Sequence, residues 1–364
     1  MIIKPKKSLI SRRSLIVGTP AVLLARKLDA QGCGGGFCYP PVASSTPSTC
    51  MSPFYRDWSK ISPPVTVIDP TTISKYVTNC FEVRAENQIG GVTFGFTEDQ
   101  TGLTSGTTDA IGTWTSTNGI YGPWTYIGDA QTGGGSWNNK GLYGPSVKEI
   151  PKGSGLFYLY YSGLSNINVS SIGFATSTTM MPGSWTAYSG NPIITGSGAG
   201  GVADPFIIDH PSGTGYIMYT ATNYPGGNTI YYYTSSDGIS WSFGGVALAA
   251  AMPGDPDYGV HSIDEPTVWK NKYCFWEMMY DLNDFHNSLG SGAATIAYAI
   301  SADGLTFTRD PSGLAPPQLF GGSNTRVIQQ DGLLYVFTDN FPDAISCGGP
   351  LYGGSGLMTI PDVA

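Results

Sequence analysis

The chain has 364 residues, a net charge of −8 and only 12% charged residues. This length allows one large domain or two ordinary ones, with a substantial buried core. Its 50 glycines and 26 prolines exceed the usual share, while 45 Tyr, Phe and Trp residues exclude a disordered composition. Low charge, many aromatic side chains and many turn formers favour an all-β protein built from short strands.

Residues 1–30 have the layout of an export signal. A basic leader contains the pair Arg12-Arg13, an 11-residue apolar run ends at Ala25, and Ala30 offers a small residue for cleavage. Paired arginines are typical of twin-arginine signals, and the apolar run is too short for a membrane anchor. We therefore predict an exported protein, either periplasmic or extracellular.

Removal of this leader would change the charge of the chain. The leader holds seven Lys and Arg residues and one Asp, so the remaining chain has a net charge of −14. Such a surface repels nucleic acid and anionic membranes, which leaves neutral polymers as partners. The predicted partner is a carbohydrate, with no nucleic acid and no membrane after signal removal; the oligomeric state is left open.

The six cysteines all follow the leader, and an exported chain can oxidise them. Six cysteines allow 15 connectivities, so we assign none. A zinc site is disfavoured because the chain has only three histidines, none of them near a cysteine pair.

A repeat follows a linker rich in Gly, Ser, Pro and Thr at about 31–52. Four apolar runs begin at Pro145, Pro205, Pro266 and Thr325, which are 60, 61 and 59 residues apart. Strand-like repeats of this period indicate the blades of a β-propeller.

Each repeat has a common internal order. A first strand is followed by an aromatic second strand, a polar loop, a third strand and an outer fourth strand. The second strands are expected at 156–163, 215–222, 273–280 and 333–340, and the third strands at 171–177, 229–235 and 295–301. The Asp-Gly pairs at 237–238 and 303–304 predict hairpin turns.

An earlier unit fits the same order, with a second strand at 90–99, a third at 110–116 and a first near 79–85. Counting it, we predict one five-bladed β-propeller domain over 53–364, with four-stranded antiparallel blades. Residues 53–75 are expected to close the ring.

The repeat places the residue that precedes each apolar run at the same mouth of the propeller channel. Gly144, Asp204, Glu265 and Asn324 directly precede the four runs. Proline is tolerated after them because the first residue of a strand need not donate to the ladder. Two carboxylates at one mouth can tune each other's pKa, as glycosidases require. Turn acids at strand starts are the alternative, and Asp264 is expected to point away.

The motifs VADPFIID, IDEPTV and YCFWEMMYD, together with LYGPSV and LFYLYYSG, carry a resemblance. Over about 140–340 the chain resembles the five-bladed glycoside hydrolases of family 43, and more distantly families 32 and 68. The resemblance implies that Glu265 is the general acid, that Asp204 tunes its pKa and orients it, and that a separate Asp on the first blade is the base of an inverting reaction.

The first blade departs from this pattern. Its register gives TNCFEV, with Asn79 or Glu82 near the expected place of the base. Asp69 has the Asp-Pro dipeptide but lies about ten residues early, and Asp57 is a further option. The base is therefore left open among these four residues.

Four further residues are candidates for substrate contact. Arg326 could hold a carboxylate or sugar hydroxyls, or form an ordinary ion pair. His261 and His286 are placed near the mouth, and Trp137 could stack on a sugar ring or pack under a loop.

We therefore predict an exported glycosidase that cleaves a polysaccharide or oligosaccharide, with arabinose- or xylose-containing substrates favoured. The alternatives are a non-catalytic carbohydrate-binding propeller and a retaining fructan-type enzyme. No cofactor or metal site is expected. Structural calcium in the channel is the one alternative, and no ligand spacing in the sequence demonstrates it.

Overall fold

The computed structural model describes residues 65–68, 77–99, 110–198, 200–222, 229–255, 258, 262–271, 274–283, 295–310, 323–339 and 355–362. Within these ranges almost all regular structure is β, which confirms the all-β prediction. The one helical element described is η4, a 3-10 turn over Gly119–Tyr121, and no described helix has the length and apolarity needed to cross a bilayer.

The described strands pair antiparallel with their neighbours in sequence, in groups of four. The first sheet contains β2 (Val77–Ile89), β3 (Val92–Asp99), β4 (Ala110–Ser116) and β5 (Thr125–Thr132). Another contains β14 (Ser262–Lys270), β15 (Trp276–Asn283), β16 (Thr295–Ser301) and β17 (Thr308–Arg309).

An eight-stranded sheet joins two such groups. One half has β6 (Gly141–Glu149), β7 (Phe157–Leu164), β8 (Val169–Ser177) and β9 (Thr186–Ala187). The other half has β10 (Gly200–Asp209), β11 (Tyr216–Thr222), β12 (Ile230–Ser235) and β13 (Ser242–Leu248). The halves meet where Gly200 and Gly201 of β10 pair parallel with Val169 and Ser170 of β8.

The last sheet combines both ends of the described chain. It contains β18 (Ser323–Gln330), β19 (Leu333–Asp339) and β20 (Ser355–Pro361), with β1 (Val65–Ile68) added beside β20. The first described strand, β1, therefore completes the last group of four by pairing with β20.

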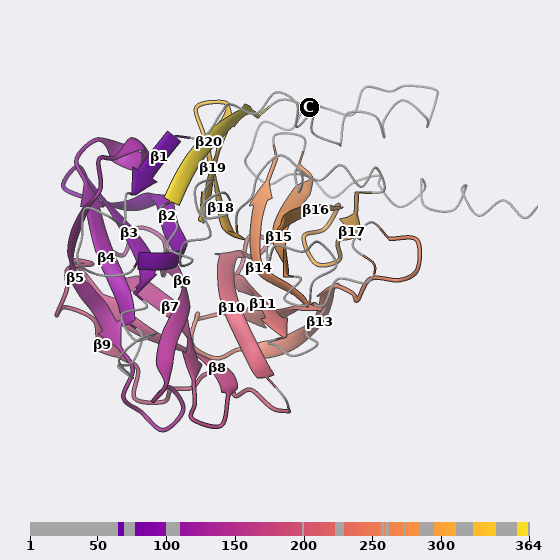
Figure 1. Ribbon diagram of the computed structural model, residues 1–364, viewed down its shortest axis with the longest axis horizontal. Helices are drawn as coiled ribbons and strands as arrows, with labels where there is room; N and C mark the ends of the chain where they lie inside the picture. Colours follow the sequence, from indigo (N-terminus) through magenta and orange to yellow (C-terminus); the bar gives the residue numbers. More distant parts are fainter. Residues whose placement is uncertain are drawn as a thin grey trace, which may run out of the picture.

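The five opening strands of these groups, β2, β6, β10, β14 and β18, are called the inner strands below. Each inner strand contacts the next, and β18 contacts β2 again. Figure 1 shows them near the middle of the molecule, with the later strands of each group farther out. The predicted second and third strands are found within a few residues of their expected bounds.

Buried apolar clusters fill the spaces between neighbouring groups. The cluster between the last and first groups contains Phe81, Trp114 and Phe337, and the rings of Phe81 and Phe337 meet edge to face at 5.4 Å. This contact packs the two ends of the repeat together through ordinary side-chain burial.

Both predicted Asp-Gly turns are present, and each is held by its own side chains. Asp237 Oδ1 accepts hydrogen bonds from the backbone N–H groups of Ile239 and Ser240, and Asp303 does the same in the next group. A buried tyrosine of the preceding group donates to each turn: Tyr160 to the Gly238 carbonyl at 2.6 Å and Tyr219 to the Gly304 carbonyl at 2.5 Å.

Removal of one such hydroxyl tests this link between groups. We expect Tyr219→Phe to lower the free energy of unfolding by about 1–2 kcal/mol, because the buried Gly304 carbonyl loses its side-chain donor. Tyr231→Phe, at a half-buried position on the third strand β12, is the matched control and should cost less than about 0.5 kcal/mol. Urea unfolding measures both, and equal losses would contradict the prediction.

Candidate functional site

Each inner strand carries the same β-bulge. The inner strand advances by three residues while its partner advances by two, directly after Asn79, Tyr143, Ala203, Asp264 and Ser323. A bulge leaves its extra residue outside the ladder and redirects side chains next to it. The expectation that Pro266 opens its strand is therefore wrong: it lies inside β14, at the bulge, where no ladder hydrogen bond is needed.

The first bulge residue has a left-handed backbone in three inner strands. The φ angles are 58° at Gly144, 55° at Asp204 and 52° at Glu265, and a proline follows each. This conformation costs a residue other than glycine about 1–3 kcal/mol, and such strain concentrates at functional sites. Two acids occupy strained positions where glycine would fit better, which favours a functional reason for both.

Asp204 and Glu265 are joined directly. The carboxylate of Asp204 accepts a hydrogen bond from the backbone N–H of Glu265. The backbone N–H of Asp204 in turn donates to Ser162 Oγ of the preceding group at 2.8 Å. The bulges of neighbouring groups are thus linked, and the Asp204 carboxylate is fixed beside the Glu265 main chain.

The surroundings of Glu265 favour its protonated form. Burial raises the pKa of Glu265 well above its usual range, and the charges of Asp281, Asp204 and Asp264 raise it further, while Arg326 lowers it. A carboxyl group that keeps its proton near neutral pH can act as a general acid. Asp264 is half-buried beside Glu265 and its charge acts on the Glu265 carboxyl group, while the expectation that its side chain points away stays a prediction.

Asp204 is buried and keeps its charge more easily. Burial raises its pKa to about 6, while the Arg326 charge and the Glu265 N–H lower it. Its carboxylate is therefore ionised at neutral pH while Glu265 holds a proton. This division between two neighbouring carboxyl groups is the one that acid catalysis needs.

Two residues of the site were not predicted. Asp281 on β15 is fully buried and lies opposite Asp264 in the ladder. The pKa of Tyr143, on β6, is raised by burial and by the charges of Asp204, Glu98 and Asp264, so its ring lies among these acids. Pairing the predicted first and second strands residue by residue could have found Asp281, because it ends the motif YCFWEMMYD.

The first group does not repeat the acidic position. Its bulge follows Asn79, so Cys80 occupies the place that Asp204 and Glu265 hold in their strands. Glu82 lies two residues farther along, and its oxygens accept hydrogen bonds from Arg84, Arg326 and the Val147 N–H. Asp57 and Asp69, the remaining candidates for the base, lie outside the described residues.

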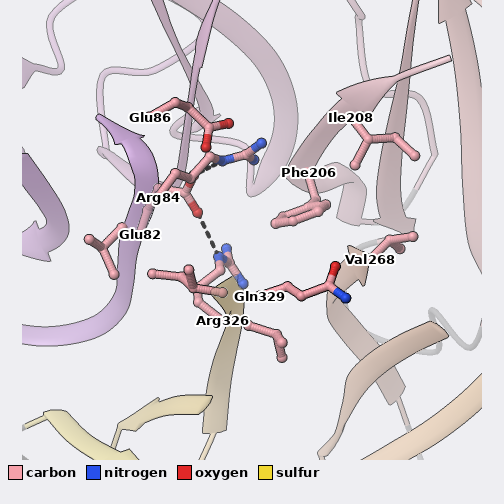
Figure 2. Close-up of a pocket in the computed structure, with 11 residues that line it drawn as sticks. Glu82, Arg84, Glu86, Phe206, Ile208, Val268, Arg326 and Gln329 are labelled. Carbon is pink, nitrogen blue, oxygen red and sulfur yellow. Dashed lines mark hydrogen bonds and ion pairs between the residues drawn. The ribbon is translucent and has the colours of Figure 1, made fainter. Parts of the chain in front are cut away.

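Arg326 is buried at the end of this network. Its Nε lies 3.1 Å from Glu82 Oε2, across the junction between the last and first groups. Figure 2 shows Arg84 and Arg326 converging on the Glu82 carboxylate beside the Phe206 ring, and the Arg84 guanidinium lies 4.6 Å from the centre of that ring. All four residues line a cavity of about 140 Å³. Of the two predicted roles, an ion pair is found, and sugar contact stays a prediction.

Trp137 is half-buried beside β7 and β8. Its ring stacks on Tyr161 at 5.9 Å, and it covers Gly163 and Gly173 so closely that a Cβ on either would lie within 2.5 Å of the indole. Packing is thus observed, and stacking on a sugar stays a prediction. His261 and His286 lie outside the described residues.

Gly144 tests how closely the Asp204 carboxylate must be held. A Cβ at Gly144 would lie 2.9 Å from Asp204 Oδ1, and its φ of 58° would be strained. We expect Gly144→Ala to displace the carboxylate and lower kcat/KM at least about tenfold, since small misplacements at a site are costly. Gly153→Ala is the matched control, with a positive φ but nothing within 4 Å of the added Cβ. Equal effects of both changes would show that backbone strain alone is responsible.

Part of the chain is similar in sequence to proteins named as arabinan endo-1,5-alpha-L-arabinosidases. No protein-family model matches the chain. It is 44% identical over 72 residues to the probable arabinan endo-1,5-alpha-L-arabinosidase A of Aspergillus flavus, covering 20% of this chain and 23% of the relative. It is 35% identical over 111 residues to the arabinan endo-1,5-alpha-L-arabinosidase A of Aspergillus niger, covering 29% and 33%. The match thus spans no more than about a third of these relatives.

Solved structures share the fold at low identity. A thermostable family-43 glycoside hydrolase superposes with a TM-score of 0.54 and 18% identity, over 78% of this chain and 88% of that one. The fructofuranosidase of Schwanniomyces occidentalis, solved with fructose, gives 0.60 and 13%, over 81% and 58%. The chain resembles the family-43 glycoside hydrolases, as its motifs predict.

Proposed function

We propose that the chain is a glycoside hydrolase with a five-bladed β-propeller fold, and that Glu265 is its general acid. The observation that carries the proposal is the pair at the bulges: Asp204 holds the Glu265 backbone, and the charges of Asp204, Asp264 and Asp281 favour the protonated form of Glu265. The cycle of contacts among the inner strands and the joining of β1 to β20 support five blades.

In this proposal each carboxyl group has one task. Glu265 donates its proton to the glycosidic oxygen as the bond to the sugar breaks. Asp204 stays ionised, raises the pKa of Glu265 and orients it through the backbone. A separate carboxylate activates water from the opposite face of the sugar, about 6.5–9.5 Å from the acid, so the configuration inverts.

The favoured substrate is an arabinose-containing polysaccharide. The sequence relatives described above are named as arabinan endo-1,5-alpha-L-arabinosidases, and the low-charge chain suits a neutral polymer. The leader, which lies outside the described residues, supports export to the compartment where such polymers occur.

A substrate screen tests the proposal. The purified protein is incubated with linear arabinan, xylan, inulin and levan, and products are followed by chromatography and by proton NMR of the new anomeric centre. We expect cleavage of arabinan with inversion. Retention on inulin or levan would favour the fructan-type alternative instead.

One observation favours a second candidate, a non-catalytic carbohydrate-binding propeller. Cys80 rather than an acid occupies the bulge position of the first group. Binding of arabinan in calorimetry, without cleavage of any polymer in the screen, would favour this candidate over the enzyme.

A further inference from the structure

The inner strands hold a network of ion pairs and hydrogen bonds whose residues come from four different groups. Glu82 lies on β2 and Arg326 on β18, and the two side chains are almost fully buried. Arg84, also on β2, donates to the Ile207 carbonyl on β10 and to Ser146 Oγ on β6. This network fixes the guanidinium of Arg326 from one side.

The position of Glu82 is unusual among the inner strands. The residues that follow the bulge in the same place are Ser146, Phe206, Thr267 and Arg326. Among these five positions, only the one in the first group is an acidic residue, Glu82, and only the one in the last group is a cationic residue, Arg326. The two opposite charges therefore meet where the first and last groups adjoin.

We infer that Glu82 is a positioning residue that acts through Arg326: it pairs with the guanidinium and partly neutralises its charge, and so sets how strongly that charge acts on the Asp204 and Glu265 carboxylates. The inference rests on the proposed function, because it assigns a task at the same site. It differs from one of the four alternatives left open for the base, namely Glu82, because the Glu82 oxygens already accept from two guanidinium groups and a backbone N–H.

Arg326 and Glu265 are each surrounded by several charged groups, and these charges determine how Glu82 affects the site. Arg326 faces Glu82 and Arg84 of β2, and its charge lowers the pKa of both Asp204 on β10 and Glu265 on β14. Glu265 also faces Asp281 of β15 and Asp264 of its own strand, which act in the opposite direction. Arg326 is therefore the cation that balances this acidic cluster.

The sign of the effect follows from the charges. In Glu82→Gln the shape is kept and the Arg326 charge is no longer neutralised, so the pKa of Glu265 falls. In Arg326→Gln the stabilising cation is removed, so the pKa of Glu265 rises. A purely structural ion pair predicts no such opposition, because both changes would loosen the same contact.

The test measures the ionisation of Glu265 directly. The full chain is labelled with 13C at glutamate carboxyl carbons, the Glu265 resonance is assigned with Glu265→Gln, and its titration midpoint is followed. We expect a lower midpoint in Glu82→Gln, a higher one in Arg326→Gln and an intermediate one in the double variant. Glu82→Asp should bring the midpoint part of the way back to the wild-type value. Asp209→Asn, which breaks the ion pair between Asp209 and Lys148, should leave the wild-type midpoint unchanged.

Activity provides a second readout. We expect kcat/KM of Glu82→Gln to fall about tenfold at pH 8 and not to fall at pH 5.5, because the unneutralised Arg326 charge lowers the pKa of both Glu265 and Asp204 and so moves both limbs toward acid. Midpoints that stay unchanged, or that move in the same direction in both single variants, overturn the inference. Opposite midpoint shifts without hydrolysis by the wild type support the inference while rejecting the proposed function, so the two fail separately.

Discussion

Glu265→Gln is expected to lower kcat/KM on arabinan about 10³-fold, since general acid catalysis contributes about 10²–10⁴-fold. Glutamine keeps the shape of the side chain and has no proton to give to the leaving oxygen. Initial rates of reducing-end release measure the loss. An aryl glycoside with an acidic phenol as leaving group needs little protonation, so it should lose much less activity. An equal loss on both substrates would contradict the acid role.

The same variant carries its own folding control. The pKa of Glu265 is higher in the folded chain than in the unfolded one, so the folded wild type loses stability as pH rises between these two values. Glutamine does not ionise and escapes this loss. We therefore expect Glu265→Gln to unfold at a higher temperature than the wild type at pH 8 and at a similar temperature at pH 4, measured by calorimetry. An inactive but more stable protein separates catalysis from folding.

The repeat made the fold predictable from sequence. Runs beginning 59 to 61 residues apart gave the inner strands, and aromatic alternation gave their partners, because both signals are local. The acids at Asp204 and Glu265 emerged from the same regularity. From the sequence alone, the proline after each acid predicts a strand start, because a bulge inside a strand depends on the register of its partner, which a single run does not contain.

The rest of the site depends on contacts between distant segments. Asp281 enters because the second strand brings it opposite Asp264, and Glu82 meets Arg326 although 244 residues separate them. Burial that shifts a pKa is likewise a property of the packed groups. Cys80 shows the limit of motif matching: the dipeptide Asp-Pro drew attention to Asp69, while the shared bulge marks Cys80 as the equivalent position.

Asp204→Asn is expected to lower the maximum kcat/KM about 10²-fold and to move the whole pH profile toward acid. The pKa of Asp204 is about 6, so the wild type should lose activity as pH falls below about 6 and this carboxylate takes up a proton. Asparagine cannot titrate, so the acid limb of the variant moves to lower pH, where the catalytic base titrates. Loss of the Asp204 charge also lowers the pKa of Glu265, so the alkaline limb moves down as well.

Asp264→Asn separates these two effects. Its charge raises the pKa of Glu265, whereas burial, Arg326 and the Glu265 N–H set the pKa of Asp204, so this variant should shift the alkaline limb more than the acid limb near pH 6. The amide of Asp204→Asn can still accept the Glu265 N–H through its oxygen, which preserves the backbone contact. The change in profile therefore follows from charge rather than from a lost hydrogen bond. Profiles of kcat/KM from pH 4 to pH 9 measure this, and an acid limb unmoved in Asp204→Asn would assign that limb to another group.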